Sequence, residues 1–409
     1  MNTLNKIRNA AFIFAMGALV LTSCDNDDEE DEQPAPAPSG NTVVTTNITS
    51  NTTWTSDRVY QLGGRITVTN GATLTIEPGT VIKGEAGSGP NATALLVARG
   101  GKLIAQGEAD FPIIFTSVAD EITPEQVASG NFVSPNLDPD VSGLWGGVII
   151  LGKAQISASN DNGDVSEVQI EGIPTSDTNG LYGGNDDADN SGIIEYISIR
   201  HGGSNIGNGN EINGLTLGGV GSATVINNIE VVGNQDDGVE WFGGSVNVNN
   251  VVVWNCGDDG IDTDQSWSGT LDNFVVIGVT GHAFELDGPE GSFEAGHTIR
   301  NGSVKMTSGG RTTEDIINVD DNSIVGLENI YFTGLVNGQQ ISEDDDLPLA
   351  QAPQVTFSNI YLDVNPANLG DYVNDAVVPA GVSAGSTPQA DVSTLQWTWA
   401  AQAGGFSGL

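Results

Sequence analysis

Positive charge is what this 409-residue chain most conspicuously lacks. Lys and Arg together number 12, against 53 Asp and Glu, which gives a formal net charge of −41. A surface of this sign repels nucleic acid and anionic lipid head groups, so both are excluded as direct partners. It attracts hard cations, above all calcium, which prefers carboxylate oxygens. The alternative is a solvated acidic shell that only maintains solubility.

Cysteine and long apolar runs are also scarce. The chain has two cysteines, Cys24 and Cys256. We expect Cys24 to be lipidated, so no intrachain disulfide would form, and Cys256 is interpreted as a buried structural thiol rather than a nucleophile. The apolar run Ala10–Leu21 has 12 residues and is too short to span a bilayer. It therefore predicts the hydrophobic region of a signal peptide.

The first 40 residues are predicted to be a targeting segment and a tether. The sequence LTSC, which ends at Cys24, resembles a lipoprotein box, and this resemblance implies diacylation of the cysteine and removal of residues 1–23. Residues 24–40 then carry an acidic run and a Pro-rich spacer, which favour an extended chain. The acidic run, 25–32, resembles the surface-export signal of Bacteroidetes lipoproteins. The predicted location is the outer face of the outer membrane; an uncleaved anchor is the alternative.

Glycine is abundant, with 55 residues, whereas proline (16) and aromatic residues (6%) are few. This composition is typical of short strands joined by tight turns. The phrases NNIEVVGN from Asn227, NNVVVWNC from Asn249 and DNFVVIGV from Asp272 repeat at spacings of 22 and 23. A period of this length indicates a solenoid. Because no helical pattern alternates with the strands, we predict an all-β parallel β-helix over 41–409, with coils of about 22 residues and a less regular part from about 335.

Several phrases extend the pattern toward a known family. The stretches GGRITVTNGATLTIEPGTVIKG from Gly63, WGGVIILGKAQI from Trp145 and DDGVEWFGGSVNV from Asp236 resemble a family of secreted Bacteroidetes lipoproteins. The resemblance runs from about Trp54 to Trp399. It implies a right-handed parallel β-helix on the cell surface, but the family supplies no chemistry.

Breaks in the repeat are predicted at 118–142, at 176–191 and from Ser342 onward. Within the first, TPEQVASG predicts a short helix with Thr123 as N-cap and proline at its first position. The closing segment WTWAAQAGGFSGL, from Trp397, is predicted to cap the last coil edge.

Two acidic phrases, NQDDGVEWFGG and NCGDDGIDTDQ, carry the candidate site, and their Asp-Asp-Gly motifs are 22 residues apart. In a β-helix, a residue one coil later lies about 4.8 Å away. The expected stacks are Asp236 under Asp258, Asp237 under Asp259, and Glu240 under Asp262. Unit charges ~5 Å apart repel by roughly 3 kcal/mol at an effective dielectric near 20. Such stacks need a cation, raised pKa values or hydrogen bonds from turn amides.

These six carboxylates have three interpretations. They are turn formers that cap backbone amides, or they bind calcium with further oxygen ligands, or they are catalytic. The third rests on similarity to polygalacturonase-type hydrolases, which carry Asn-x-Asp, Asp-Asp, Gly-His-Gly and Arg-x-Lys on successive coils. The resemblance implies Asp258 or Asp259 as general acid, Asp237 as activator of water, His282 as support for the acid and Arg300 as a uronate ligand. The chain departs from the motifs at Ala283 and in RNGSVK. A calcium-dependent uronate lyase with a basic residue is a related possibility.

Two tryptophans, Trp241 and Trp267, fall in corner regions beside the acidic phrases. Exposed ring faces there would bind a sugar, and the alternative is that both rings fill the core. The sequence thus predicts a lipid-anchored, calcium-stabilised surface module that binds extracellular glycan or a partner protein. A β-helix carbohydrate-active enzyme is the alternative function.

Overall fold

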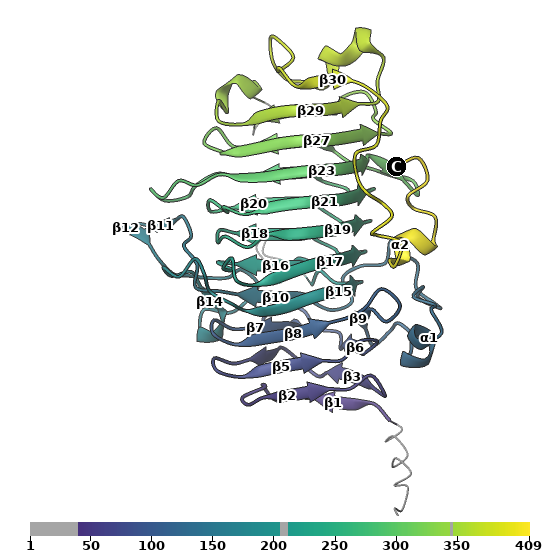
Figure 1. Ribbon diagram of the computed structural model, residues 1–409. Helices are drawn as coiled ribbons and strands as arrows, with labels where there is room; N and C mark the ends of the chain where they lie inside the picture. The colour runs from purple at the N-terminus through teal and green to yellow at the C-terminus, as the bar shows by residue number, and fades with distance from the viewer. Residues whose placement is uncertain (1–39, 205–211, 344–346) are drawn as a thin grey trace, which may run out of the picture. The chain divides into compact units, whose positions relative to one another are not determined.

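The computed structural model describes residues 40–204, 212–343 and 347–409. The signal peptide, Cys24 and all but the last residue of the tether lie outside the described residues. The described residues form one compact unit, built of short strands stacked in successive coils (Figure 1). Among the described residues, no helix has the length and apolarity needed to cross a membrane.

Parallel strands form two main sheets. The 15-stranded sheet, here called the long sheet, contains β1 (Thr42–Val44), β2 (Thr52–Trp54), β3 (Val59–Leu62), β5 (Thr73–Ile76), β6 (Val81–Gly84), β8 (Lys102–Gln106), β9 (Ile113–Ser117), β15 (Gly192–Arg200), β17 (Val225–Val232), β19 (Val248–Trp254), β21 (Thr270–Ile277), β23 (His297–Lys305), β27 (Val325–Thr333), β29 (Thr356–Leu362) and β30 (Val382–Ala384).

The nine-stranded sheet, here called the short sheet, contains β4 (Ile66–Val68), β7 (Leu95–Val97), β10 (Val148–Leu151), β16 (Leu215–Gly218), β18 (Val239–Phe242), β20 (Ile261–Asp264), β22 (His282–Leu286), β26 (Asp315–Val319) and β28 (Ile341–Glu343). Neighbouring strands pair in parallel at the predicted spacing, as with Glu240 opposite Asp262 and Asp262 opposite Glu285. The predicted parallel β-helix is therefore confirmed.

Each long strand from β15 onward turns a corner at one residue with positive φ. Tyr196 begins the series with φ 51°, and asparagines follow it on the next strands. They are Asn228, Asn250, Asn273, Asn301, Asn329 and Asn359, with φ between 53° and 60°. Asparagine tolerates this left-handed conformation better than most residues. Hydrogen bonds also link successive side chains, for example from Asn273 Nδ2 to Asn250 Oδ1 at 2.7 Å.

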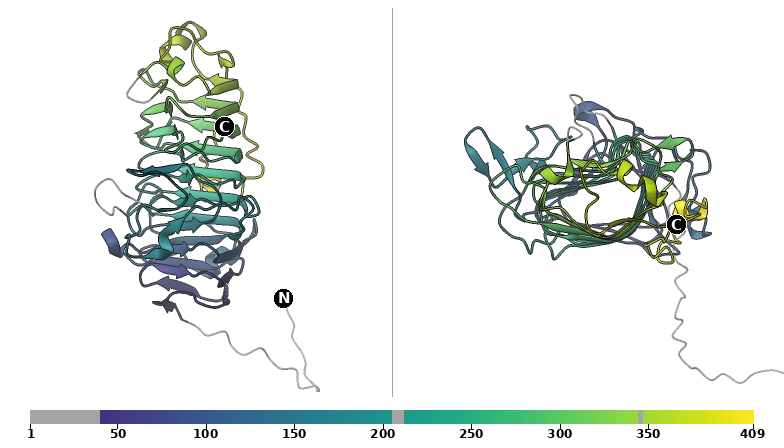
Figure 2. Two further views of the ribbon diagram at one scale, coloured as in Figure 1. Left: turned by 90° about the vertical axis from the view of Figure 1, so that its left-hand side faces the viewer. Right: turned by 90° about the horizontal axis from the view of Figure 1, so that it is seen from above.

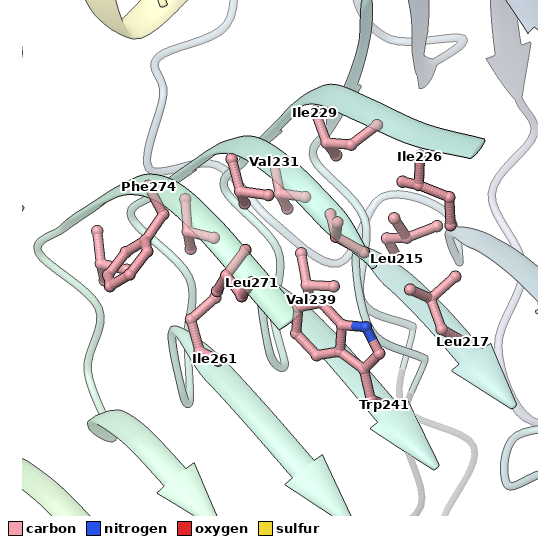
Figure 3. Packing of buried hydrophobic residues seen from close by; sticks show 14 of the residues in the cluster. Leu215, Leu217, Ile226, Ile229, Val231, Val239, Trp241, Ile261, Leu271 and Phe274 are labelled. Atoms are coloured by element: carbon pink, nitrogen blue, oxygen red, sulfur yellow. The ribbon is translucent and has the colours of Figure 1, made fainter. Parts of the chain in front are cut away.

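Apolar side chains fill the interior of the coils. On β18, Val239 and Trp241 point into this core, whereas Glu240 alternates to the outer face, as the two-residue period of a strand requires. Figure 3 shows Trp241 lying beside Val239 and Leu217 within the core. The two-residue period thus decides which side chains of β18 face the core and which face outward.

The first coil break forms the predicted helix, α1 (Pro124–Ala128), and Thr123 Oγ1 with the Gln126 side chain makes a capping box. The second break is longer than predicted, since β10 ends at Leu151 and β15 begins at Gly192. It contains two hairpins, β11 (Ala158–Asn160) with β12 (Gly163–Val165), and β13 (Val168–Gln169) with β14 (Leu181–Tyr182). A third small hairpin joins β24 (Thr307–Ser308) to β25 (Arg311–Thr312).

The C-terminal part keeps the coil architecture with longer loops. Although the sequence repeat fades after about residue 334, the coils continue through β29 and β30. Short 3-10 helices punctuate the loops: η1 (Gly89–Asn91), η2 (Thr178–Gly180), η4 (Leu349–Gln351) and η5 (Pro366–Tyr372). Residues 344–346 of the third predicted break lie outside the described residues.

The closing segment does not cap the last coil, so that prediction is wrong. Instead it runs back along the outer face of the long sheet, where Asp391 N donates to Asn273 Oδ1 at 2.7 Å and Ala400 N donates to Glu230 Oε1 at 2.9 Å (Figure 1). Its helix α2 (Trp399–Gln402) packs in an apolar cluster with Val232 and Trp254. Figure 2 shows this tail lying beside the coils in both further views. Its tryptophans Trp397 and Trp399 are 5% and 2% exposed in this position, and burial of such rings favours it.

Candidate functional site

The turns that lead into the short sheet carry a ladder of acids. Asp237 Oδ1 accepts a hydrogen bond from Asp259 N at 2.8 Å, and Asp259 Oδ1 accepts one from His282 N. Each aspartate therefore caps a backbone amide one coil further on, as the turn-forming interpretation predicts. The expected stacking of Asp237 under Asp259 is confirmed.

A second acidic ladder stands on the outer face of the same strands, where Glu240, Asp262 and Glu285 are register partners. Outer-face residues of a solenoid are normally exposed, yet Glu240 and Asp262 are only 7% and 8% exposed. Nearby, the second coil break covers the sheet: Ile156 and Tyr182 join Phe242 of β18 in an apolar cluster. The insertion therefore turns an exposed acidic face into a buried one.

Burial beside other carboxylates raises the pKa values of the acids on this face. Desolvation, and then the neighbouring Asp259 carboxylate, raise the pKa of Asp237 well above its usual value. Desolvation and Glu171 do the same for the pKa of Glu240, and desolvation and Glu240 raise the pKa of Asp262. Each of these acids is therefore costly to ionise unless a cation neutralises it.

Among the residues that the structure describes, three sets of side chains have ligand atoms within 4.8 Å of one another. They are Asp236, Asp237 and Asp258; Asp237, Glu240 and Asp262; and Asp259, His282 and Glu285. The first two sets offer only oxygen, which is the donor calcium prefers. The third set adds an imidazole nitrogen.

The set of Asp237, Glu240 and Asp262 fits calcium on a further observation. Asp262 Oδ1 is buried and has no hydrogen-bond partner among the described residues. The same holds for Oδ1 of Asn213, which is 0% exposed and whose amide nitrogen donates to Glu240 Oε2. Buried oxygens without a donor are costly unless a cation or a proton serves them. The residues present therefore fit a hard cation.

In the third set, His282 Nδ1 lies 3.3 Å from Asp259 Oδ1 and 4.0 Å from Glu285 Oε1. Desolvation opposes ionisation of Asp259, but the nearby His282 imidazole and Glu285 carboxyl outweigh it and lower the pKa of Asp259. The pKa of Glu285 is raised to about 10, first by the hydrogen bond between Glu285 and Asp259 and then by burial. Sharing of a proton between the two carboxyl groups explains why their pKa values move apart.

A comparison with protein families agrees with the β-helix fold. A family model described as pectate-lyase like beta helix domain matches residues 46–403. The chain belongs to this family. No curated protein and no solved structure matches it. Membership in the pectate-lyase-like family confirms the right-handed sense of the predicted β-helix, and the resemblance to Bacteroidetes lipoproteins stays a prediction.

The predicted sugar-binding role of Trp241 and Trp267 is wrong. The two rings stack on each other inside the pectate-lyase-like domain, with centroids 4.7 Å apart, and are 0% and 1% exposed. Trp267 Nε1 donates to Val246 O at 3.0 Å, so its polar end is satisfied within the core. The two-residue strand period places Trp241 inward, and a corner position in the sequence does not change that.

The structure brings His282 to Asp259, as the polygalacturonase-type resemblance implies, but not Arg300. That residue lies on β23 of the long sheet, where Arg300 Nη2 pairs with Asp272 Oδ2 at 2.8 Å. Its assignment as a uronate ligand of the acidic cluster is therefore wrong. The spacing of the motifs gives the coil in which a residue lies, but not the sheet to which its strand belongs. Cys256 is buried, and desolvation raises its pKa to about 12, as expected of an inert thiol.

Two features of the site were not predicted. Glu285 was not among the candidate ligands, although its spacing of 23 residues from Asp262 gave the signal. A polar cleft of about 570 Å³ also opens between the β11–β12 hairpin and the loop that follows β22, and Phe293 lines it with Gln155 and Asp164. Asp164 accepts a hydrogen bond from Ser292 N at 3.1 Å, which ties the two walls together. Residues 128 positions apart meet here, so sequence offered no signal.

Proposed function

We propose that this β-helix is a calcium-stabilised binding module for extracellular glycan, displayed on the cell surface through a lipid on Cys24. The observation that carries the proposal is the burial of the carboxylates: Asp237, Asp259 and Asp262 are 7%, 2% and 8% exposed. Asp258, the other predicted general acid, is exposed. The buried acids cannot contact a polymer, so their crowding calls for a structural cation. In this proposal Asp237, Glu240 and Asp262 hold the calcium.

The glycan would bind in the cleft beside Phe293. A volume of about 570 Å³ falls in the range of small-ligand sites. Phe293 is half-buried, so one part of its ring remains available to a sugar face, and Gln155, Asp164 and Ser166 offer hydrogen bonds at the same opening. This cleft takes the role that the sequence assigned to the two buried tryptophans.

A glycan array, run with calcium and with a chelator, tests the proposal. Phe293→Ala should weaken any binding at least tenfold, since an aromatic face supplies much of the contact area with a sugar. Phe111→Ala, which removes an exposed phenylalanine outside the cleft, is the matched control and should bind like the wild type. Binding that Phe293→Ala leaves unchanged, or capture of a protein partner with no glycan binding, would refute the cleft as a glycan site.

A carbohydrate-active enzyme is the second candidate, because His282 stands beside Asp259 with Glu285 in reach. A hydrolase would position its acid in this way. Release of reducing ends or unsaturated uronates from pectin or alginate, lost in Asp259→Asn, would establish it. We expect no turnover, because Asp237 and Asp259 are buried and Arg300 lies on the other sheet.

The surface location is tested separately. Cys24→Ala should release the protein from the membrane. Neutralising the acidic run at 27–30 should keep it anchored but hide it from protease added to intact cells. Unchanged access of protease in the neutralised variant would rule out the export signal.

A further inference from the structure

Beside the calcium ligands Asp237, Glu240 and Asp262 lies a group of mixed nitrogen and oxygen ligands, formed by one imidazole and two carboxylates. We propose that Asp259, His282 and Glu285 form a site for a transition-metal dication of the zinc class, distinct from the calcium ligands. Nitrogen and carboxylate oxygen together are a donor set that zinc takes readily, whereas calcium prefers six to eight oxygens.

The distances within the group agree with a shared metal. Zinc binds nitrogen and carboxylate oxygen at about 2.0–2.2 Å, so two ligands at a tetrahedral angle lie roughly 3.4 Å apart and wider angles separate them further. His282 Nδ1 is 3.3 Å from Asp259 Oδ1 and 4.0 Å from Glu285 Oε1. Both separations are in the range that one ion would bridge.

His282 Nδ1 itself is the second observation. This atom is buried and has no hydrogen-bond partner among the described residues, although the Asp259 carboxylate is nearby. A buried ring nitrogen that faces two carboxylates without a good hydrogen bond is a donor in need of a partner. Metal coordination would satisfy it.

The backbone is also shaped to bring these groups together. A Cβ at Gly281 would clash with Oδ1 of both Asp258 and Asp259, so only glycine lets the chain pass this closely before His282. Asp259 is fixed from the opposite side, because its backbone N–H donates to Asp237 Oδ1. Two of the three ligands are thus held before any ion arrives.

The site differs from the calcium set in its access to solvent. The side chains of His282 and Glu285 are 22% and 34% exposed, whereas that of Asp259 is 3% exposed. An ion could enter from the His282 and Glu285 side, and three protein ligands would leave a coordination position for water. No reaction is assigned to that water, and metal binding at this site is independent of glycan binding.

Cobalt is the probe for this site, because Co²⁺ occupies zinc sites and gives a visible ligand-field spectrum. The purified full-length protein, stripped with a chelator, should develop that spectrum on titration with Co²⁺, and Zn²⁺ should remove it. His282→Gln should weaken Co²⁺ binding at least tenfold. Asp110→Asn, which removes one exposed acid remote from the three sets, should bind Co²⁺ like the wild type.

A second pair of variants separates the two metals. Glu240→Gln should keep the cobalt spectrum but lose the rise in melting temperature with calcium. Glu285→Gln should do the reverse, and it serves in place of His282→Gln if that variant does not fold. Absence of a cobalt spectrum in the wild type, or a spectrum that survives both His282→Gln and Glu285→Gln, would overturn the proposal and leave a proton-sharing cluster. The calcium proposal could fail or stand independently of either result.

Discussion

Two regions of this solenoid bury charge in opposite ways. At the outer face of the long sheet, Arg200 and Glu230 are 1% and 0% exposed, and they lie 3.8 Å apart with Ser198 Oγ bonded to both. At the short sheet, Asp237, Glu240 and Asp262 are buried together. Among the described residues, none of these three acids forms an ion pair with Lys or Arg. The first region contains its own counterion, whereas the second must obtain a cation or protons from solution.

The difference has a structural counterpart in what covers each region. The C-terminal tail covers the first, with the Trp399 ring 4.9 Å from the Arg200 guanidinium and Ala400 N bonded to Glu230. Here the covering segment completes the electrostatic network. The second coil break lies over the short sheet instead, and it adds a further acid, Glu171, that raises the pKa of Glu240. A covering segment can therefore stabilise a charged face or leave it dependent on a ligand.

The largest effect is expected where the charges are paired. Glu230→Gln should lower the free energy of unfolding by about 3–5 kcal/mol, because it leaves the buried Arg200 guanidinium without its counterion. Chemical denaturation monitored by circular dichroism measures this loss, at a fixed calcium concentration. A loss under about 1 kcal/mol would mean that Arg200 finds another partner and that the pair does not secure the tail.

Removal of calcium should act on the other region. With calcium at about 100 times its dissociation constant, a site that exists only in the folded state adds about 2.7 kcal/mol. A chelator should therefore lower the melting temperature of the wild type, and Asp262→Asn should make the melting temperature insensitive to calcium. Identical melting of the wild type in chelator and in excess calcium would return these acids to a purely turn-forming role.

Acidity should affect the acidic region in the direction opposite to a salt bridge. Asp237, Glu240 and Asp262 have raised pKa values in the folded protein, so in chelator the folded state holds more protons than the unfolded chain above about pH 4. Stability should then rise as pH falls from about 7 toward 5, because the folded state takes up protons before the unfolded chain does. Saturating calcium should reduce this slope, because it displaces the protons. Urea unfolding at several pH values gives the slope, and a loss of stability on acidification in chelator would contradict the assignment.

The smallest effect is expected at an exposed ion pair. Arg300 pairs with Asp272, and the two side chains are 44% and 26% exposed. Arg300→Gln should change the free energy of unfolding by no more than about 1 kcal/mol, because water already solvates both charges. The same denaturation experiment provides the comparison with Glu230→Gln. Equal losses in the two variants would show that burial does not distinguish the pairs.

The sequence determined the repeat and hence the fold. Asn227, Asn249 and Asp272 recur at spacings of 22 and 23 residues. Because this spacing equals one coil, the backbones of successive repeats pair regularly when their strands stack on one another. The same period placed Asp237 under Asp259 and Glu240 under Asp262, so the acidic ladder could be predicted from the spacing of the residues. Local chemistry was predictable too, since the capping box at Thr123 depends on residues three positions apart.

The tertiary structure alone decided which side chains face a ligand. Trp267, which lies in the turn after β20, stacks on Trp241 inside the core, and Arg300 lies on the long sheet because a repeat unit contributes strands to both sheets. Burial of the acids and the cleft at Phe293 depend on an insertion that folds back over the short sheet from another part of the chain. A repeat fixes contacts between neighbouring coils, since these lie one period apart. Contacts made by insertions and by the tail join residues far apart in the chain and follow no period, so only packing in three dimensions determines them.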